Sequence, residues 1–182
     1  MEIREETTAD HAAVRRVHEL AFGDHGEKVA VLNEALRLTL PSAEGLSLVA
    51  EVDGAVVGHV LFSTNLLDAP RRLVKVPVLS PIGVLPELHG QGIGTALIRR
   101  GLQVLEERGA PLVFLEGDPG FYSRVGFKAG ADLGFRKPSL RIPERAFQVY
   151  PLAGLEDWMT GTLVYSHLFW DHDSVGLRDP EA

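Results

Sequence analysis

Residues 80–95 read SPIGVLPELHGQGIGT, and the interpretation of the whole chain depends on this stretch. Gly90, Gly92 and Gly94 alternate immediately before a helix expected over Gly92–Arg108. Glycine allows positive φ angles and a close approach of the backbone to a ligand. The first turn of a helix adds N–H groups without partners and the positive end of the helix dipole. The pattern therefore favours a phosphate-binding loop over a simple turn.

Two familiar phosphate-binding loops fit this stretch poorly. A Walker A loop needs a lysine after its last glycine, whereas Gly94 is followed by Thr95. In the dinucleotide fingerprint the third glycine would fall at Thr95, and residues Leu85–His89 separate the strand from the glycines. An NAD(P)-binding oxidoreductase is therefore the weaker alternative.

Pro81 lies near the end of a strand expected over Leu73–Val84. Proline lacks the N–H that a ladder requires, so strand pairing should loosen there. The backbone groups of Ile82 and Val84 would then be free to pair with a ligand that contains amides. The alternative is an edge strand with a bulge.

The rest of the chain alternates strand-like and helix-like segments. Asp53-Gly54 between two β-rich runs is a strong hairpin signal, because a type I′ turn needs positive φ at both central residues. We expect a mixed α/β fold with one domain over residues 1–170 and a flexible tail over 171–182. The expected helices are 11–22, 27–40 and 92–108, and the main strands are 1–5, 46–52, 55–64, 73–84 and 111–115.

Composition excludes several classes of protein. The chain has 182 residues, a formal net charge of −7 and no cysteine, which excludes disulfides and thiolate chemistry. It contains no apolar run long enough for a membrane span, and its acidic start is not a secretory signal, so we expect a cytoplasmic protein that binds neither membrane nor nucleic acid. His167 and His172 with their acidic neighbours are too loosely spaced to predict a metal site.

Two motifs together resemble the GNAT family of N-acetyltransferases. The first is His89-x-x-Gly92-x-Gly94 before a helix, with His89 where the family usually has Arg or Gln. The second is FYSRVGF at residues 121–127, at the expected distance downstream. Further similarity, over residues 57–62 and 143–165, is to the YhbS-like branch of the family.

This resemblance implies the acyl-CoA N-acyltransferase fold, a mixed and mostly antiparallel sheet that splays between its fourth and fifth strands. It implies acetyl-CoA as acetyl donor, CoA as product, and a primary amine of a small molecule or peptide as acceptor. The pyrophosphate would lie on the glycine loop and the pantetheine arm along the fourth strand. The implied cofactor-binding residues are Ile82, Val84, His89, Gly90, Gln91, Gly92, Gly94, Thr95 and Arg124.

Acetyl transfer needs a proton donor for the leaving thiolate and a proton acceptor for the amine. Tyr122 matches the family tyrosine, and a phenol stays protonated at neutral pH, so we expect it to be the general acid. The sequence identifies the proton acceptor less clearly. We expect His59, because the ordinary pKa of histidine suits a base near neutral pH. The other candidates are Glu27, Glu116 and Asp118.

Charge is unevenly distributed along the chain. Residues 124–145 have a net charge of +4, which favours a basic patch that binds an anionic ligand. Arg124 and Lys128 are the candidates for a contact with the 3′-phosphate of the cofactor. The alternative is chance clustering of charges on a solvated surface. Residues 1–70 have a net charge of −7, which favours a cationic amine. A non-catalytic acyl-CoA sensor is the other competing function, and a homodimer is the default assembly for a small enzyme.

Overall fold

The computed structural model describes residues 1–40 and 44–179. The chain forms two compact units, which are described separately below. Unit 1 contains residues 1–63 and 79–108, and unit 2 contains residues 64–78 and 109–182. Two long strands, β3 (Ala55–Asp68) and β4 (Leu73–Val84), run through both units. The single domain expected over residues 1–170 stays a prediction.

Unit 1 contains an antiparallel sheet with helices on both faces. The turn between β2 (Leu46–Val52) and β3 has positive φ at Asp53 (51°) and Gly54 (79°), as the predicted hairpin requires. β1 pairs with β2 in antiparallel register, with Ile3 opposite Ala50. Besides its parts of β3 and β4, the unit contains β1 (Glu2–Glu5), η1 (Thr8–Asp10), α1 (His11–Ala21), η2 (Gly23–His25), α2 (Gly26–Arg37), β2 (Leu46–Val52), η3 (Pro86–Leu88) and α4 (Ile93–Glu107).

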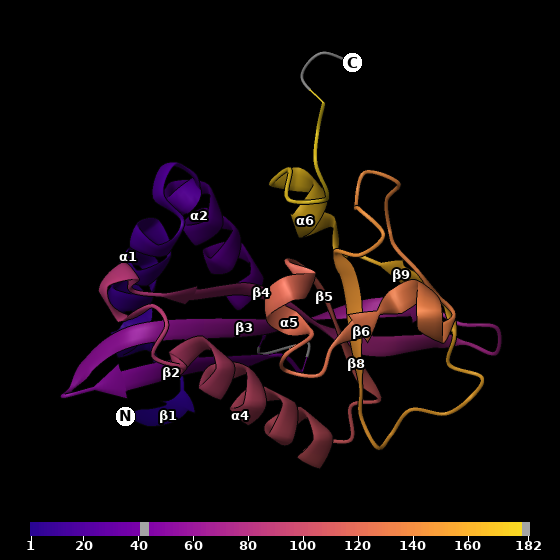
Figure 1. The fold of residues 1–182 in the computed structure, drawn as a ribbon, viewed down its shortest axis with the longest axis horizontal. Coiled ribbons are helices and arrows are strands. Elements are labelled where there is room, and N and C mark those ends of the chain that lie inside the picture. Colours follow the sequence, from indigo (N-terminus) through magenta and orange to yellow (C-terminus); the bar gives the residue numbers. More distant parts are fainter. Residues whose placement is uncertain (41–43, 180–182) are drawn as a thin grey trace. The chain divides into compact units, whose positions relative to one another are not determined.

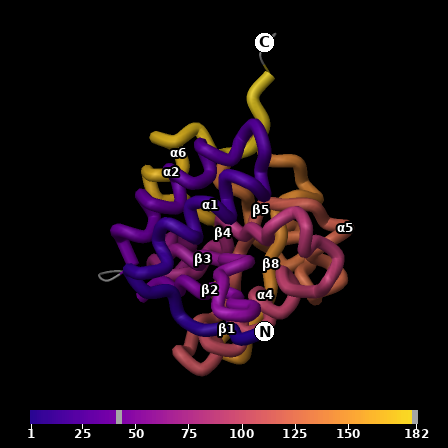
Figure 2. Tube along the Cα trace, turned by 90° about the vertical axis from the view of Figure 1, so that its left-hand side faces the viewer, coloured from indigo at the N-terminus to yellow at the C-terminus, as the bar shows by residue number. Residues whose placement is uncertain are grey.

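Helices α1 and α2 cover one face of the unit 1 strands, and α4 covers the other (Figures 1 and 2). Glycines in the strands allow the helices on both faces to lie close to the sheet. A Cβ at Gly83 would lie 3.0 Å from Nδ1 of His18 on α1, and a Cβ at Gly58 would lie 3.1 Å from Leu97 on α4. The missing side chains therefore set how closely the helices pack against the sheet.

Unit 2 is built around β5 (Leu112–Glu116) and its antiparallel neighbour β8 (Phe147–Pro151), which pair along their full lengths. Phe114, Phe135 and Phe147 form an aromatic core, with ring centroids 5.0 and 5.4 Å from that of Phe114. Besides these two strands and its parts of β3 and β4, the unit contains α5 (Pro119–Tyr122), β6 (Lys128–Ala129), η4 (Gly130–Leu133), β7 (Phe135–Arg136), β9 (Gly161–Val164) and α6 (His167–Asp171).

The strands follow the order β1-β2-β3-β4-β5-β8-β6, with β9 beside β3 and β7. Most neighbouring pairs are antiparallel, and β4 runs parallel to β5 with Val78 opposite Phe114. β7 and β9 form a further short parallel pair. The predicted mixed, mostly antiparallel sheet flanked by helices is confirmed. The separation of β4 from β5 beyond Val78 stays a prediction.

Several boundaries differ from those expected. α2 ends at Arg37 rather than at residue 40, and β3 extends to Asp68. Part of the segment expected to be a flexible tail is packed within unit 2, where Val175 is buried and its carbonyl accepts a hydrogen bond from the Arg141 side chain. Residues 180–182 of that segment lie outside the described residues. None of the helices formed by residues 1–40 and 44–179 combines the length and apolar character needed to cross a bilayer.

Candidate active site

The glycine loop of unit 1 connects β4 to α4. Leu85 anchors its start, because the Leu85 N–H donates to the Val57 carbonyl at 2.9 Å. Gly90 (φ 77°) and Gly92 (φ 82°) both take left-handed backbone conformations, and Gly92 is the N-cap residue of α4. A Cβ built at either glycine would meet open space. Glycine is therefore needed here for conformation and not for packing.

The amides of this loop have no protein partners. Among the hydrogen bonds of the described residues, none uses a backbone N–H of residues 90–95 as donor, and the first paired amide is that of Ala96, which donates to Gly92 at 2.9 Å. The first turn of α4 contains no acidic residue. Six consecutive free donors at the positive end of a 15-residue helix fit an anion with several oxygens, such as a diphosphate.

His89 lies at the entrance of the loop and faces back toward β4. Its Nε2 is 2.8 Å from the Val84 carbonyl oxygen. Since a carbonyl only accepts, Nε2 donates and His89 ties the loop to the end of the strand. The structure thus brings the predicted residues from Ile82 to Thr95 together in unit 1. A contact between His89 and pyrophosphate stays a prediction.

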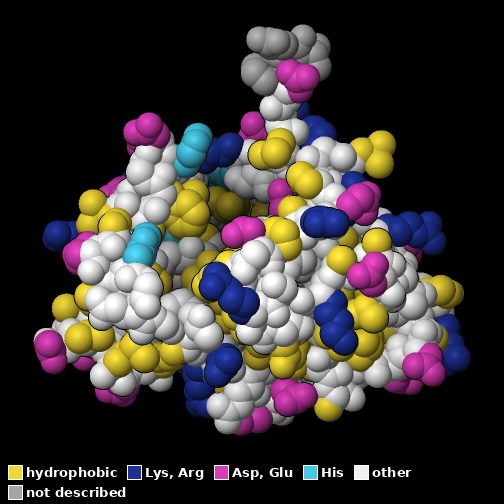
Figure 3. Space-filling model, viewed as in Figure 1, with side chains coloured by type: hydrophobic (Ala, Val, Ile, Leu, Met, Phe, Trp, Pro, Cys, Tyr) yellow, Lys and Arg dark blue, Asp and Glu magenta, His cyan; other side chains and the backbone are white. Residues whose placement is uncertain are grey.

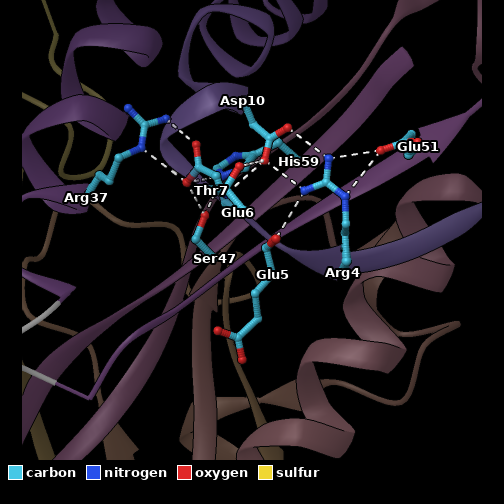
Figure 4. Close-up of polar contacts among 9 residues, drawn as sticks. All are labelled: Arg4, Glu5, Glu6, Thr7, Asp10, Arg37, Ser47, Glu51 and His59. Carbon is cyan, nitrogen blue, oxygen red and sulfur yellow. Dashed lines mark hydrogen bonds and ion pairs between the residues drawn. The ribbon is translucent and has the colours of Figure 1, made fainter. Parts of the chain in front are cut away.

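His59, the predicted base, is fully buried on β3. Its Nδ1 is 2.8 Å from Nε2 of His18 on α1, and its Nε2 is 2.8 Å from the Ser47 hydroxyl. Figure 4 shows that Ser47 also contacts Glu6, and that Glu6 in turn contacts Arg37. Burial lowers the pKa of His59, and the neighbouring Glu6 opposes that shift. His59 therefore has no ring nitrogen left for a substrate, and a base role for it requires a further group.

His18, His59, Ser47 and Glu6 are connected by these contacts and form the buried cluster. Among the described residues, Glu6 is its only carboxylate. Its oxygens accept hydrogen bonds from Arg37 at 2.7 and 3.1 Å and from the Ser47 hydroxyl at 2.6 Å. Burial by itself would raise the pKa of Glu6, but His59, Arg37 and Ser47 together lower it to about 2. Glu6 is therefore an anion throughout the physiological range.

Tyr122, the predicted general acid, lies on α5 in unit 2. Asp118 caps this short helix by accepting from the Gly120 N–H at 2.9 Å, and the Tyr122 ring packs edge-on against Phe127. Burial, with a smaller contribution from the charge of Asp118, raises the pKa of Tyr122 to about 12. The phenol is therefore protonated at neutral pH and available only as a proton donor. Its action on a thiolate stays a prediction.

The other predicted residues of unit 2 mostly have local partners. Arg124 places its guanidinium 6.0 Å from the ring centroid of Phe121. Glu116 accepts from the Gly176 N–H, and burial raises the pKa of its carboxyl group. Lys137 in the basic segment pairs with Glu144. Figure 3 shows that Lys and Arg side chains around α5 and β6 are separated by apolar and acidic ones.

Three members of the buried cluster were not predicted from the sequence: His18, Ser47 and Glu6. The signal for His18 was its position on the apolar face of α1, four residues after Val14 and one after Val17, all three of which are buried. A polar side chain on the core-facing stripe of a helix needs an internal partner. No comparable signal marks Glu6, which follows an edge strand. Among the described residues no group of three or more His, Asp or Glu side chains could hold a metal ion.

Sequence comparison finds one family along most of the chain. The family model described as "Acetyltransferase (GNAT) domain" matches residues 2–130. The N-acetyltransferase YjhQ of Escherichia coli is 35% identical over 137 residues, which cover 75% of this chain and 74% of YjhQ. YhbS, another N-acetyltransferase of E. coli, is 38% identical over 128 residues, which cover 68% of this chain and 74% of YhbS.

Structure comparison finds the same group of proteins. The crystal structure of E. coli YhbS in complex with CoA matches with a TM-score of 0.83 and 30% identity, over 97% of this chain and 95% of that one. A GNAT acetyltransferase from Brucella melitensis in complex with acetyl-CoA matches with a TM-score of 0.72 and 36% identity, over 92% and 97% of the two chains.

Proposed function

Because this chain belongs to the GNAT family of acetyltransferases, we propose that it transfers the acetyl group of acetyl-CoA to a primary amine of a small molecule or peptide. The observation that carries the proposal is the run of six partnerless amides at residues 90–95. The CoA and acetyl-CoA held by the two similar crystal structures support it.

The glycine loop would hold the diphosphate of acetyl-CoA through main-chain N–H groups. Gly90 and Gly92 leave open space beside the backbone, so an anion can approach without meeting a side chain. The position of α4 behind the loop adds the positive end of its dipole. Acetyl-CoA supplies an activated thioester when bound, and the chain's own residues bind and orient it.

Acetyl transfer itself leaves three further tasks. The N–H of Val84 would polarise the thioester carbonyl, a type of contact whose removal costs roughly 3–4 kcal/mol where it has been measured. The amine nitrogen would form a bond to the carbonyl carbon and lose a proton to a base or to water, while the carbon–sulfur bond breaks. Tyr122 would donate a proton to the departing thiolate, which is consistent with a phenol that stays protonated.

A pair of matched glycine variants tests the role of the loop. Gly92 and Gly109 flank α4, both have φ near 80°, and a Cβ at either would meet open space. Alanine at either position should therefore cost a similar amount of stability, about 1–2 kcal/mol. Thermal-shift titration with acetyl-CoA, CoA and NADH should show CoA binding lost or weakened at least tenfold in Gly92→Ala and unchanged in Gly109→Ala.

The same titration separates the competing functions. A shift with NADH alone would contradict the acetyltransferase proposal in favour of an oxidoreductase. A shift with acetyl-CoA without thiol release, in an assay with spermidine, phenethylamine, glycinamide and a lysine-containing peptide, would favour an acyl-CoA sensor. The proposal predicts both a shift with acetyl-CoA and thiol release with at least one of these amines.

A further inference from the structure

Glu116 ends β5 in unit 2 and has one fixed and one free carboxylate oxygen. Its side chain is half-buried, and Oε2 accepts a hydrogen bond from the Gly176 N–H at 3.3 Å. Oε1 makes no hydrogen bond or ion pair with any described residue, and it is not sealed from solvent. A ligand or a water molecule can therefore reach Oε1 while Oε2 stays held by the protein.

The segment after α6 holds this carboxylate. Val175 is buried, and its carbonyl accepts a hydrogen bond from the Arg141 side chain. Leu177 donates its N–H to the Arg141 carbonyl at 3.1 Å. Gly176 lies between these two contacts with a φ of 61°, and a Cβ there would lie 2.6 Å from the Arg141 carbonyl carbon. Residues 175–177 are therefore fixed against Arg141, so that the Gly176 N–H keeps Glu116 in one orientation.

Glu116 and Tyr122, the proposed general acid, lie on opposite sides of β5. Gly117 follows Glu116 directly, and a Cβ at Gly117 would lie 2.4 Å from the Tyr122 ring. Since successive residues of an extended chain point to opposite sides, the Glu116 side chain points away from Tyr122. Figure 2 shows α5, which carries Tyr122, and α6 on opposite sides of β5. The end of β5 thus presents a proton donor on one side and a carboxylate on the other.

The other predicted bases are less suited to accept a proton. Both ring nitrogens of His59 have partners within the buried cluster. Asp118 is exposed and accepts from the Gly120 N–H, and Glu27 is exposed on α2. Among the predicted bases, Glu116 alone combines partial burial with a free oxygen.

We propose that Oε1 of Glu116 receives the proton that the acceptor amine loses, and that the Gly176 N–H positions the carboxylate for this step. The inference rests on the proposed acetyltransferase function and adds a proton acceptor to it. The nitrogen lone pair forms the bond to the acetyl carbon, so the nitrogen becomes positively charged. Its N–H bond then breaks and an O–H bond forms at Oε1, directly or through one water molecule, while the nitrogen keeps the electron pair. The electron pair of the carbon–sulfur bond leaves with the thiolate.

The surroundings of Glu116 favour a proton on it more than water does. Burial raises the pKa of the carboxyl group, and the Gly176 N–H and the charge of Arg141 oppose this shift without cancelling it. Tyr165 also lies close enough to interact with Glu116, and it stays neutral because burial and the charge of Glu116 raise its pKa. A carboxylate with a raised pKa is a stronger base than an exposed glutamate, as general base catalysis near neutral pH requires.

A comparison of two substitutions at Glu116 tests the role of its charge. Glu116→Gln keeps the shape of the side chain and an acceptor for the Gly176 N–H, but it cannot take up a proton. It should lower kcat by about 100-fold, which is the lower end of the range known for general acid–base catalysis. Glu116→Asp keeps the carboxylate on a shorter side chain and should lose only about tenfold. If Glu116→Asp is as slow as Glu116→Gln, the shape of the side chain matters and not its charge, and the inference is wrong.

The pH dependence of kcat distinguishes a proton acceptor from a structural residue. At saturating substrates, kcat of the native protein should fall at low pH as Glu116 takes up a proton, and this fall should be absent in Glu116→Gln. A purely structural role would leave the fall in place. Asp132→Asn is the control, because Asp132 is exposed on η4 of the same unit, and its kcat and pH profile should equal those of the native protein.

Carbon-13 NMR tests the site without turnover. In protein labelled with ¹³C-glutamate, the Cδ signal that disappears in Glu116→Gln belongs to Glu116. It should titrate with a midpoint above the usual glutamate pKa of 4.5, because burial raises the pKa of this carboxyl group. A midpoint at or below 4.5 would overturn the inference, since Glu116 would then be no stronger a base than an exposed glutamate.

The outcomes separate this inference from the function on which it rests. If the native protein shows neither a thermal shift with CoA nor thiol release, the proposed function fails. If the native protein turns over and Glu116→Gln keeps its thermal shift with CoA and its kcat within about threefold, only this inference fails. Should Glu116→Gln not fold, added formate should raise kcat of Glu116→Ala at least about tenfold by supplying the missing carboxylate, and no rise would overturn the inference.

Discussion

The glycine loop and the buried histidine cluster are both in unit 1, and they treat their polar groups in opposite ways. The loop is built from backbone and leaves six consecutive amides unpaired at residues 90–95. The cluster is built from side chains and pairs the ring nitrogens of its histidines, except Nδ1 of His18. An anion is accommodated where many donors are left free. The cluster instead satisfies its polar groups internally, apart from that one nitrogen.

A negative charge placed in the loop should produce the largest effect. Thr95 is the third residue of α4, where an acidic side chain ordinarily stabilises a helix. Thr95→Asp should therefore leave the melting temperature of the free protein unchanged or slightly raised, yet raise KM for acetyl-CoA at least about 30-fold, which corresponds to roughly 2 kcal/mol. Steady-state kinetics and a melting curve measure the two effects.

Thr95→Asn is the matched control, because it has the same shape as Asp without the charge. Its KM for acetyl-CoA should change only a few-fold. Equal effects of the two substitutions would contradict an anion site at the start of α4 and indicate a steric requirement instead.

Removing the phenol of Tyr122 should have the next largest effect. Tyr122→Phe keeps the packing against Phe127 but removes the proton donor, so kcat should fall about 10- to 100-fold with little change in KM for acetyl-CoA. Tyr150→Phe is the control, since Tyr150 also packs against the ring of Phe127. If kcat of Tyr122→Phe stays within about twofold of the native value across pH, the acid role is wrong.

The buried histidines should produce a smaller effect, on stability. The folded protein holds His18 and His59 neutral, with pKa values below their usual value. The unfolded chain takes up these protons near pH 6.5, so the stabilisation is complete above that pH and is lost as the pH falls toward the folded pKa values. Melting temperatures should therefore decrease between pH 7.5 and pH 5, and less steeply in His18→Gln. An equal slope in both proteins would contradict the burial of a neutral histidine pair.

The sequence alone predicted the loop because the loop is local. Three alternating glycines before a helix and the Asp53-Gly54 turn each depend on backbone preferences of adjacent residues, and both lie where they were expected. The ends of α2 and β3 were misplaced because packing extends or shortens an element beyond what local propensity indicates.

The buried cluster was not predictable in the same way. Its members come from β3, from α1, from β2 and from the segment after β1, and each alone is typical of an ordinary strand or helix. Only the fold brings His18 and His59 into contact, and that contact uses Nε2 of His18 and leaves its Nδ1 without a partner. The role of His59 as the base stays a prediction, and both of its ring nitrogens have partners inside this cluster.

Amide hydrogen exchange of the glycine loop tests the central claim most directly. In the free protein the amides of residues 90–95 should exchange rapidly, because they have no acceptor. At saturating CoA their exchange should slow at least about tenfold, while the exposed amides of the turn at Asp53-Gly54 stay unchanged. Binding of CoA with no added protection at residues 90–95 would contradict a loop that holds the diphosphate through its main chain.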